Sequence, residues 1–394
     1  MNAQTHSVLL YVHGSAEMYG SDKVLFNLAT AAAAEPHWDP VVVLHEDGPL
    51  CDALARAGVE VHVGAVAKIG RAMFTVAAPL TLWWQMRRSA QDIDRLLQGR
   101  KVAVVYSNTL AVLGGAFWAL RHRIKHVWHV HEIILQPAAV SWGLPRLVSM
   151  LADRVICNSR QTEGWLLSRV PRLASLTSVI FNGIGPVPQP SATELDAFRV
   201  RVGAASNEVI VTLAGRLNRW KGHALLIEAA ALLLREGRLG KMRIVMVGDT
   251  LAGQEDIRAR MMKQVRDCGL DEYVRFVPFV SKIEVVWRAS DIAVVPSLEP
   301  EPFGMVAIEA MACGLPVIAA AHGGLLDIVL HEETGLVFEP RDACALAQAL
   351  TRLAADGELR RRLGAAGYAR QRELFSLQRQ VDMTREMLHD LGVV

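Results

Sequence analysis

Short apolar runs alternate with longer amphipathic segments along most of the chain. The run Ser7–Val12 has the length and the Val and Leu content of a buried strand, and a helical pattern follows over about Asp22–Ala34. Further predicted strands are Pro40–His45, Glu60–Val63, Val102–Tyr106, His126–His129 and Arg154–Cys157, and further predicted helices are Asp52–Ala57, Leu80–Leu97, Thr109–Leu120 and Leu144–Ala152. Alternating strands and helices predict a parallel sheet with helices on both faces.

A proline-rich stretch that starts at Gly185, GPVPQPSATE, interrupts the alternation and is interpreted as a linker. After it the pattern restarts with the predicted strands Glu208–Ala214, Met242–Val247, Val274–Phe276 and Ile292–Val295, and with the predicted helices His223–Arg235, Glu255–Cys268, Lys282–Ala289 and Gly304–Cys313. The chain is therefore predicted to form two doubly wound α/β domains with a cleft between them. Ligands of such sheets bind at the carboxyl ends of the strands.

Composition agrees with this architecture and argues against some classes of function. With 394 residues, of which 52% are hydrophobic and 21% charged, the chain is long enough for two domains with ample cores. A net charge of +2 gives no case for nucleic-acid binding. The five cysteines are odd in number and far apart, which is typical of reduced cytoplasmic proteins. The longest apolar runs, Thr75–Trp84 and Thr109–Leu120, are too short to cross a bilayer, so a cytoplasmic location is expected.

The stretch Val294–Ala319 has the most specific chemical pattern. It is predicted as strand, acidic loop, helix and strand, with Glu301 in the loop and Glu309 inside the helix. Backbone N–H groups that suit an anion such as phosphate are offered at the start of this helix by Gly304, Met305 and Val306. Gly304 also leaves room for a ligand to approach the backbone. A carboxylate beside an anion site is explained if Glu309 accepts hydrogen bonds from sugar hydroxyls, which points to a nucleotide sugar.

This E-x7-E stretch resembles the retaining glycosyltransferases of family 4 (glycosyl transferases group 1), which have the GT-B fold. The resemblance runs, with gaps, from the first strand to the last helix. It implies an α/β architecture of two Rossmann-like domains facing a central cleft. Residues 1–187 would form the acceptor-side domain, and residues 188–374 the domain that binds the nucleotide sugar. Residues 375–394 would form a helix that packs back on the first domain.

The segment Ala214–Gly222 resembles the family's G-R-x4-K-G motif. Arg216 leaves a predicted strand and Lys221 precedes a predicted helix, so both cations can converge on one site. Two fixed cations would stabilise the charge that grows on a leaving nucleoside diphosphate, so that no metal is required. The D-x-D spelling at Asp92 and Asp94 lies inside a predicted helix, where residues two apart do not share a face, and is not interpreted as a metal site.

The loop after the first strand is a candidate for substrate binding. Tyr19–Lys23 resembles the family's glycine-rich loop, with a tyrosine at the place of the first family glycine. Gly20 and Ser21 would then be the residues whose backbone approaches the substrate. An ordinary strand-to-helix turn is the alternative interpretation. A G-x-G-x-x-G fingerprint for nicotinamide cofactors is absent from this loop.

Two further positions resemble the family at strand ends. His131 and Glu132 correspond to a histidine followed by an acid, and the family histidine contacts the donor sugar, whereas His129 is interpreted as structural. Pro278 stands where the family usually has a glycine whose backbone reads the base. Proline removes that N–H donor, so the base is left open.

Aromatic and basic residues occur together in two segments of the first domain, Trp83–Arg88 and Arg121–His126. Such patches suit peripheral contact with anionic lipid headgroups. A core helix with a solvated edge is the alternative, and it is the simpler one. The membrane hypothesis places the enzyme at the inner membrane face, where it acts on a lipid-linked acceptor.

Together these motifs predict a retaining, metal-independent glycosyltransferase without a cofactor. It would move a sugar from a UDP- or GDP-sugar to a hydroxyl of a glycan or lipid-linked acceptor, in cell-surface polysaccharide biosynthesis. The predicted catalytic residues are Glu301, His131, Arg216 and Lys221, and the predicted substrate-binding residues are Gly20, Ser21, Phe303, Gly304, Met305, Val306 and Glu309. Glu309 would bind the ribose, while Glu301 and His131 would position the donor sugar. A nucleotide-sugar epimerase and a binding protein that has lost its chemistry remain alternatives.

Overall fold

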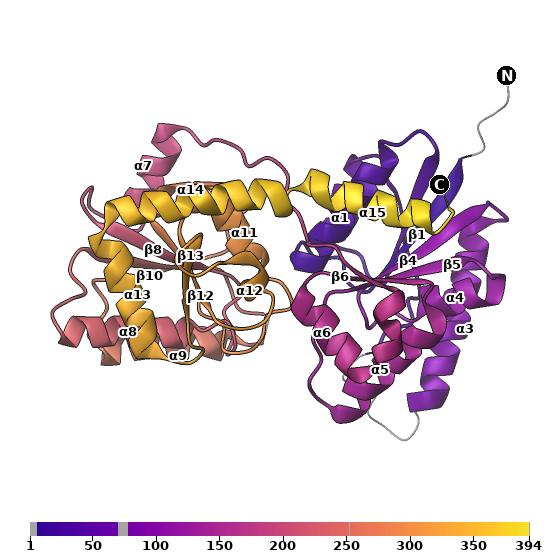
Figure 1. The fold of residues 1–394 in the computed structure, drawn as a ribbon, viewed down its shortest axis with the longest axis horizontal. Coiled ribbons are helices and arrows are strands. Elements are labelled where there is room, and N and C mark those ends of the chain that lie inside the picture. The colour runs from indigo at the N-terminus through magenta and orange to yellow at the C-terminus, as the bar shows by residue number, and fades with distance from the viewer. Residues whose placement is uncertain (1–5, 70–77, 252, 394) are drawn as a thin grey trace. The chain divides into compact units, whose positions relative to one another are not determined.

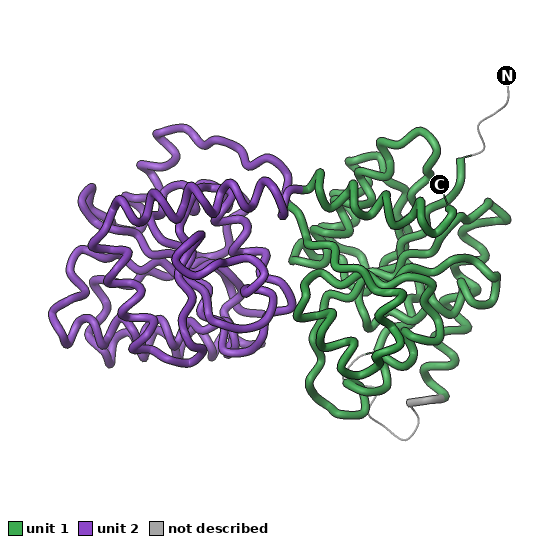
Figure 2. The backbone as a smooth tube through the Cα atoms, viewed as in Figure 1, with its two compact units in different colours: residues 1–183, 377–394 green, residues 184–376 purple. Residues whose placement is uncertain are grey.

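The computed structural model describes residues 6–69, 78–251 and 253–393, and the chain forms two compact units (Figure 2). Unit 1 comprises Met1–Gly183 and Leu377–Val394, and unit 2 comprises Ile184–Ser376. The chain therefore passes from unit 1 into unit 2 and returns to unit 1 in its last helix. The division after Gly183 lies shortly before the predicted boundary at residue 187, because the N–H of Ile184 donates to the carbonyl of Phe375 in unit 2.

Seven parallel strands form the sheet of unit 1, in the order β3-β2-β1-β4-β5-β6-β7. They are β1 (Ser7–His13), β2 (Trp38–Leu44), β3 (Glu60–Val63), β4 (Val102–Asn108), β5 (Lys125–Val130), β6 (Arg154–Cys157) and β7 (Thr177–Val179). In the register of the central strands His13 lies opposite Asn108, and Asn108 lies opposite His129. Buried polar residues therefore line up at the carboxyl ends of strands that are otherwise apolar.

The helices of unit 1 cover both faces of this sheet. They are α1 (Gly20–Ala33), α2 (Pro49–Arg56), α3 (Ala78–Leu97), α4 (Gly114–His122), α5 (Ala138–Leu151), α6 (Arg160–Arg169), the short 3-10 helix η2 (Pro171–Ser175) and α15 (Leu377–Asp390). Leu9 and Tyr11 pack in one core with α1, α2 and α15, whereas Val8 and Leu10 pack in a second core with α3 and α4. Successive strand residues point to opposite faces, so one strand serves both cores. Figure 1 shows α1 and α15 on one side of the sheet and α3, α4 and α5 on the other.

Some helices of unit 1 differ from their predicted bounds. α4 begins at Gly114 rather than at Thr109, because the loop before it is held elsewhere: the N–H of Leu110 donates to the Glu132 carboxylate at 3.0 Å. α5 begins earlier than predicted. α6 was not predicted, and its start is stabilised by Ser159, whose side chain accepts the N–H of Thr162.

Six parallel strands form the sheet of unit 2, in the order β10-β9-β8-β11-β12-β13. They are β8 (Val209–Ala214), β9 (Met242–Val247), β10 (Val274–Val277), β11 (Ile292–Val295), β12 (Val317–Ala320) and β13 (Gly335–Phe338). The helices are α7 (Ala192–Arg201), α8 (His223–Arg235), α9 (Glu255–Asp267), α10 (Ile283–Ala289), α11 (Met305–Ala312), α12 (Leu325–Ile328), α13 (Ala343–Ala355) and α14 (Gly357–Leu374). The predicted fold class, two parallel sheets that alternate with helices, is confirmed in both units.

The predicted linker is partly helical. Its prolines all precede Ser191, and α7 begins at the next residue. Ser191 and Glu194 form a capping box in which the N–H of Glu194 donates to the Ser191 hydroxyl, and the N–H of Ser191 donates to the Glu194 carboxylate at 3.0 Å. The prolines led to the interpretation of the whole stretch as a linker. They end before Ser191, however, so the residues from Ser191 onward are free to form a helix.

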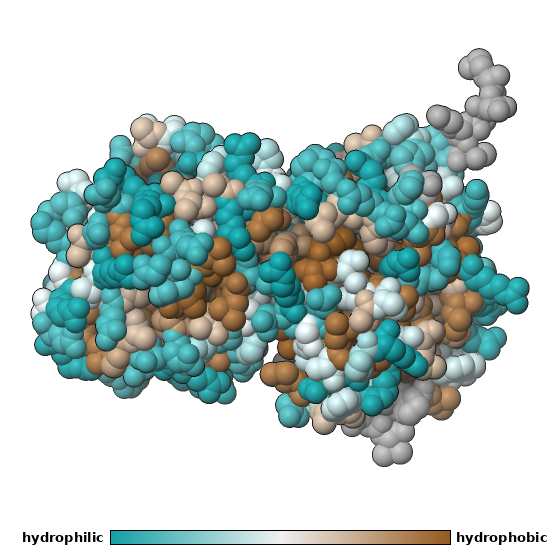
Figure 3. Space-filling view, in the orientation of Figure 1, coloured by the Kyte–Doolittle hydropathy of each residue, from teal (hydrophilic) through white to brown (hydrophobic). Residues whose placement is uncertain are grey.

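The surface of each unit is mixed in polarity. On the face seen in Figure 3 hydrophilic residues predominate, with smaller hydrophobic areas among them, as is usual for folded proteins. Within the parts of the chain that the structure describes, no helix combines the length and the apolar character needed to span a membrane.

Candidate active site

The loop between β8 and α8 contains both predicted diphosphate-binding cations. Arg216 follows the end of β8, and Lys221 precedes Gly222, the N-cap residue of α8. Gly222 has φ +80°, and a Cβ there would overlap the carbonyl oxygen of Pro296. Only glycine therefore allows this loop to lie against the segment that follows β11. A hydrogen bond of 2.7 Å from the N–H of Leu298 to the carbonyl of Trp220 joins the same two segments.

Lys221 and Glu301, predicted to bind the diphosphate and the donor sugar, form an ion pair. The distance from Lys221 Nζ to Glu301 Oε1 is 2.7 Å, and the two side chains are 17% and 6% exposed. The ammonium group also lies 4.4 Å from the ring centroid of Trp220. A positive and a negative group are thus held side by side at the carboxyl ends of β8 and β11, where a charged ligand of either sign finds a partner.

A second set of contacts holds Glu301 in place. The hydroxyl of Ser297 donates to the same oxygen, Oε1, and the N–H of Gly324 donates to the Glu301 carbonyl at 2.7 Å. His322 Nε2 in turn contacts the carbonyl of Ser297 at 2.7 Å. Gly323 and Gly324 therefore lie against the acidic loop and support its backbone.

The remaining predicted residues of unit 2 lie at the start of α11. Gly304 is the N-cap residue with φ +124°, and a Cβ there would lie 2.6 Å from Leu325 Cδ2. The positive φ and the packing against α12 thus require a glycine at this position. This structural reason differs from the predicted one, which was room for a ligand to approach the backbone. Phe303 is buried and packs edge to face on Phe375, with ring centroids 5.9 Å apart. Met305, Val306 and Glu309 are half-buried.

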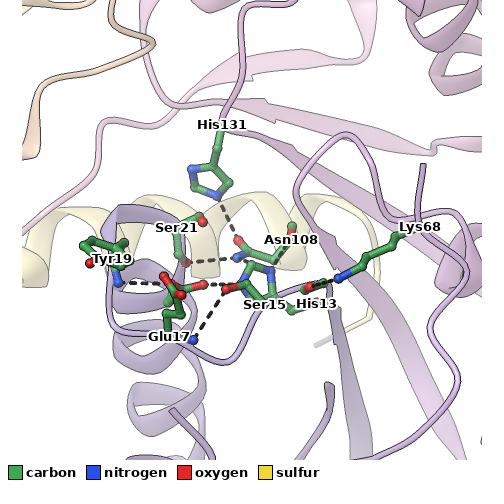
Figure 4. A network of polar contacts seen from close by, with 10 residues as sticks. His13, Ser15, Glu17, Tyr19, Ser21, Lys68, Asn108 and His131 are labelled. Carbon is green, nitrogen blue, oxygen red and sulfur yellow. Dashed lines mark hydrogen bonds and ion pairs between the residues drawn. The ribbon is translucent and has the colours of Figure 1, made fainter. Parts of the chain in front are cut away.

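In unit 1 the predicted residues Ser21 and His131 belong to one polar network (Figure 4). The amide nitrogen of Asn108 donates to the Ser21 carbonyl at 3.0 Å, and the amide oxygen of Asn108 contacts His131 Nε2 at 2.8 Å. Gly20 is the first residue of α1, next to Ser21. Asn108, at the end of β4, therefore connects the first turn of α1 with the histidine that follows β5.

A buried contact between His13 and Asp22 supports this network. His13 Nε2 contacts Asp22 Oδ1 at 2.7 Å, and His13 Nδ1 contacts the carbonyl of Asn108 at 2.6 Å. His13, Asp22 and Asn108 are 1%, 2% and 0% exposed. The other carboxylate oxygen of Asp22 accepts the N–H of Tyr19 at 3.0 Å, which holds the loop in which the family glycine is replaced.

Two histidines, His129 on β5 and His131 just after its end, are kept neutral. Burial lowers the pKa of His129 to about 3 and the pKa of His131 well below its usual value, and the neighbouring His129 and His13 lower the latter further. The two rings lie 3.9 Å apart, and His129 Nδ1 contacts the Tyr106 hydroxyl at 2.8 Å. Burial raises the pKa of Glu132, whose carboxylate accepts the backbone N–H groups of residues 110 and 131.

Sequence reasoning missed His13, Asp22, Asn108 and Ser297. A usable signal existed for His13 and Asn108, because each is a polar residue one or two positions after a predicted strand, and the carboxyl ends of neighbouring parallel strands share one side of a sheet. Asp22 and Ser297 had no such signal. Their partners are known only once the chain has folded.

The two D-x-D carboxylates, Asp92 and Asp94 on α3, have separate structural partners. Asp92 accepts the N–H of Ala65 at 3.0 Å and pairs with Arg95, while Asp94 accepts from the indole N–H of Trp118 at 2.8 Å. Among the described residues no three His, Cys, Asp or Glu side chains come together as a metal site would require. Metal independence of the reaction stays a prediction.

Fold and site together define a protein of two Rossmann-like units. At the carboxyl ends of the strands of the second sheet lie a cation, a carboxylate and the N-terminus of a helix. Comparison with protein families agrees with this description. The family model described as Glycosyltransferase Family 4 matches residues 20–186, and that described as Glycosyl transferases group 1 matches residues 196–370. The chain belongs to the group 1, family 4 glycosyltransferases, with the GT-B fold.

Individual relatives show the same resemblance. A D-inositol 3-phosphate glycosyltransferase of Geodermatophilus obscurus is 32% identical over 235 residues, which are 59% of this chain and 51% of the relative. The chain thus matches about half the length of such curated relatives. Anabaena HepE, solved with UDP and glucose, has a TM-score of 0.82 and 26% identity, covering 98% of this chain and all of HepE (100%). Sucrose-phosphate synthase of Thermosynechococcus elongatus has a TM-score of 0.76 and 25% identity, with 98% and 99% covered.

Proposed function

We propose that this protein transfers a sugar, with retention of configuration, from a nucleoside-diphosphate donor to a hydroxyl of a glycan or lipid-linked acceptor. The observation that carries the proposal is the cluster at the carboxyl ends of β8 and β11. It places Lys221 2.7 Å from Glu301 and holds Arg216 in the same short loop as Lys221. A diphosphate requires fixed cations, and a sugar requires a fixed acceptor of hydroxyl hydrogen bonds.

The proposed roles divide between the charges. Arg216 and Lys221 stabilise the negative charge that develops on the diphosphate as the bond from the anomeric carbon to the phosphate oxygen breaks. Glu301 accepts hydrogen bonds from the donor sugar, and Glu309 accepts them from the ribose. The acceptor oxygen forms the new bond to the anomeric carbon, and its proton passes to the leaving phosphate. No metal is needed if the two cations neutralise the diphosphate.

Uridine is the proposed base. The support is that HepE, 25% identical to this chain with a TM-score of 0.82, was solved in complex with UDP-glucose. GDP remains the competing nucleotide. A panel of nucleoside diphosphates separates the two.

We further propose action at the cytoplasmic face of a membrane, in the synthesis of a cell-surface polysaccharide. Two exposed tryptophans support the membrane contact. Trp83 and Trp84 on α3 are 43% and 58% exposed, and the Arg87 guanidinium lies 5.5 Å from the centroid of the Trp83 ring. Tryptophan beside arginine suits the interface of an anionic bilayer. If the protein stays in the supernatant with vesicles rich in anionic lipid at low salt, the membrane proposal is wrong.

Thermal unfolding with UDP, GDP and the other nucleoside diphosphates, with a metal chelator present, tests the proposed site. A ligand at about 100 times its Kd should stabilise the native state by roughly 2.7 kcal/mol. The expected result is a shift with UDP that is lost in Arg216→Ala and retained in Arg219→Ala, since Arg219 is exposed in the same loop. Absence of a shift with every nucleotide would reject the proposed donor.

Turnover with a UDP-sugar then separates the proposal from its alternatives. A transferase releases UDP only when an acceptor is present and produces a glycoside whose anomeric configuration, read by NMR, matches that of the donor. An epimerase would convert the donor without an acceptor. A binding protein would show the UDP shift and no turnover under any condition.

A further inference from the structure

Asn108 makes a separate contact with each of two predicted site residues. Its amide nitrogen donates to the carbonyl of Ser21 at 3.0 Å, and a carbonyl can only accept. This contact fixes which end of the amide is nitrogen, so the oxygen is the atom that faces His131 Nε2 at 2.8 Å. Figure 4 shows the His131 ring directed at the oxygen of this amide, while Ser21 lies beside its nitrogen.

The orientation of the amide determines where the proton of His131 lies. An amide oxygen has no hydrogen to donate, so the hydrogen bond exists only if Nε2 of His131 is protonated. In a neutral imidazole the other nitrogen then has a lone pair. His131 with this tautomer accepts a hydrogen bond at Nδ1 and cannot donate one there.

We propose that Asn108 is a positioning residue that holds His131 as a neutral imidazole with its hydrogen on Nε2, so that Nδ1 accepts a hydrogen bond from a hydroxyl of the sugar substrate. The proposal rests on the proposed function and names the direction of one of its hydrogen bonds. A hydroxyl donor is the chemistry that such a nitrogen recognises, in contrast to a phosphate oxygen, which would be repelled by its lone pair.

The surroundings keep Asn108 in this position. Its own backbone carbonyl accepts from His13 Nδ1 at 2.6 Å, and His13 is held on its other side by Asp22 at 2.7 Å. Asn108 is therefore bound through its side chain on two sides and through its backbone on a third. All these groups are buried, so the amide has little freedom to rotate and exchange its ends.

Several titratable groups surround His131, and each affects its protonation. His129 stacks on it with ring centroids 3.9 Å apart, and His13 lies on the far side of Asn108 with its partner Asp22. The Glu132 carboxylate accepts the backbone N–H of His131 at 3.0 Å. The amide of Asn108, which directly contacts the ring, contributes no charge, whereas a carboxylate there would favour the imidazolium.

The variant Asn108→Asp tests the proposal with purified full-length protein. Its carboxylate should raise the pKa of His131, so that His131 is protonated on both nitrogens as the pH falls and can no longer accept. Over the pH range in which both proteins stay folded, as circular dichroism would show, wild-type turnover should stay level on the acid side. The variant should lose activity there, with kcat falling on the order of 10-fold per pH unit below the raised pKa. The UDP-induced thermal shift, which reports on unit 2, should be unchanged.

Asn158→Asp is the matched control. Asn158 is also a buried asparagine at the carboxyl end of a strand, directly after β6, but its amide oxygen accepts from the hydroxyl of Thr162 at 2.9 Å. This variant should show no new loss of activity in acid. Loss of the same size in both variants would overturn the proposal, because a general effect of a buried carboxylate would then explain the result.

A measurement without turnover completes the test. In a long-range 1H–15N spectrum of 15N-histidine-labelled protein, with the signal of His131 identified by its loss in His131→Gln, the wild type should show a neutral ring protonated on Nε2. A ring protonated on Nδ1 would overturn the proposal even if Asn108→Asp does not fold. If wild-type protein neither binds UDP nor turns over a UDP-sugar, the proposed function is wrong. The tautomer of His131 can still be measured in that case, and it decides whether the inference about Asn108 is right.

Discussion

The two units place polar residues at the same location, the carboxyl ends of a parallel sheet, but they assemble them differently. In unit 2 the candidate residues come from two short continuous segments, 215–222 and 297–309. In unit 1 they are single residues from separate parts of the chain: His13, Asp22, Asn108 and His131. The first cluster combines opposite charges, a half-buried lysine and a buried glutamate, whereas the second is buried throughout and ends in a neutral histidine.

This difference indicates a division of tasks. A lysine that is partly exposed can exchange one anionic partner for another at a moderate cost, which suits the binding and release of a diphosphate. A buried network of hydrogen bonds has no alternative partners nearby and therefore fixes one geometry. We infer that unit 2 supplies the electrostatic stabilisation of the reaction and that unit 1 supplies orientation.

Arg216→Ala is expected to have the largest effect. Removal of a cation that stabilises the leaving diphosphate should lower turnover on the order of 10²-fold or more. Steady-state turnover with the donor identified by the thermal shifts measures it, and Arg219→Ala, exposed in the same loop, should stay near wild type. Near-normal turnover of Arg216→Ala would contradict the proposal that unit 2 stabilises the leaving diphosphate.

Lys221→Met should follow in size. It leaves the Glu301 carboxylate, 6% exposed, without its cation, so the free energy of unfolding should fall by about 3 kcal/mol. Adding Glu301→Gln should recover part of the loss, because the uncompensated charge is then gone. Urea unfolding measures both. Lys263→Met breaks an exposed pair with Asp267 and serves as the control, with an effect within about 0.5 kcal/mol; equal effects at the two lysines would contradict the prediction.

Gly222→Ala tests the contact that brings the two segments of unit 2 together. Alanine at φ +80° is strained, and its Cβ would overlap the carbonyl oxygen of Pro296. Gly237→Ala has φ +65° with no atom within 4 Å of the new Cβ, so it isolates the backbone strain, which is about 1–2 kcal/mol. Gly222→Ala should destabilise by about 2 kcal/mol more than this control in thermal or urea unfolding. Equal losses would mean that the loop can move away from β11.

Acid should destabilise unit 1 more than unit 2. Burial lowers the pKa of His126 to about 4 and that of His129 to about 3, and His131 is lowered as well. An unfolded histidine binds its proton near pH 6.5, so between these values the unfolded chain holds more protons and stability falls as the pH falls. The slope is about 1.4 kcal/mol per pH unit for each histidine.

Hydrogen exchange at a series of pH values can resolve the two units. In the described part of unit 2 the corresponding buried histidine is His223, with a pKa lowered to about 3. Amides of β4 and β5 should therefore lose protection at a higher pH than amides of β8 and β9. Parallel loss in both units would show that the difference in buried histidines does not decide acid stability.

Much of the architecture could be predicted from the sequence. The alternation of apolar runs and helical patterns predicted both parallel sheets, because hydrophobic periodicity is a local property. Errors occurred where a tertiary contact replaced a local preference. Thr109–Leu113 has a helical composition, yet the Glu132 carboxylate takes the N–H of Leu110 and delays the start of α4. The capping box at Ser191 likewise begins α7 in a stretch interpreted as a linker.

The sequence by itself determined the fold class, the family resemblance and the candidate residues Arg216, Lys221, Glu301 and Glu309, because these stand at fixed spacing beside recognisable strands and helices. Tertiary structure alone decided which of them are partners. The pairing of Lys221 with Glu301 and the contacts of Asn108 with Ser21 and His131 join positions that are distant along the chain. Strand order and close packing create such contacts, and neither is encoded in any one segment.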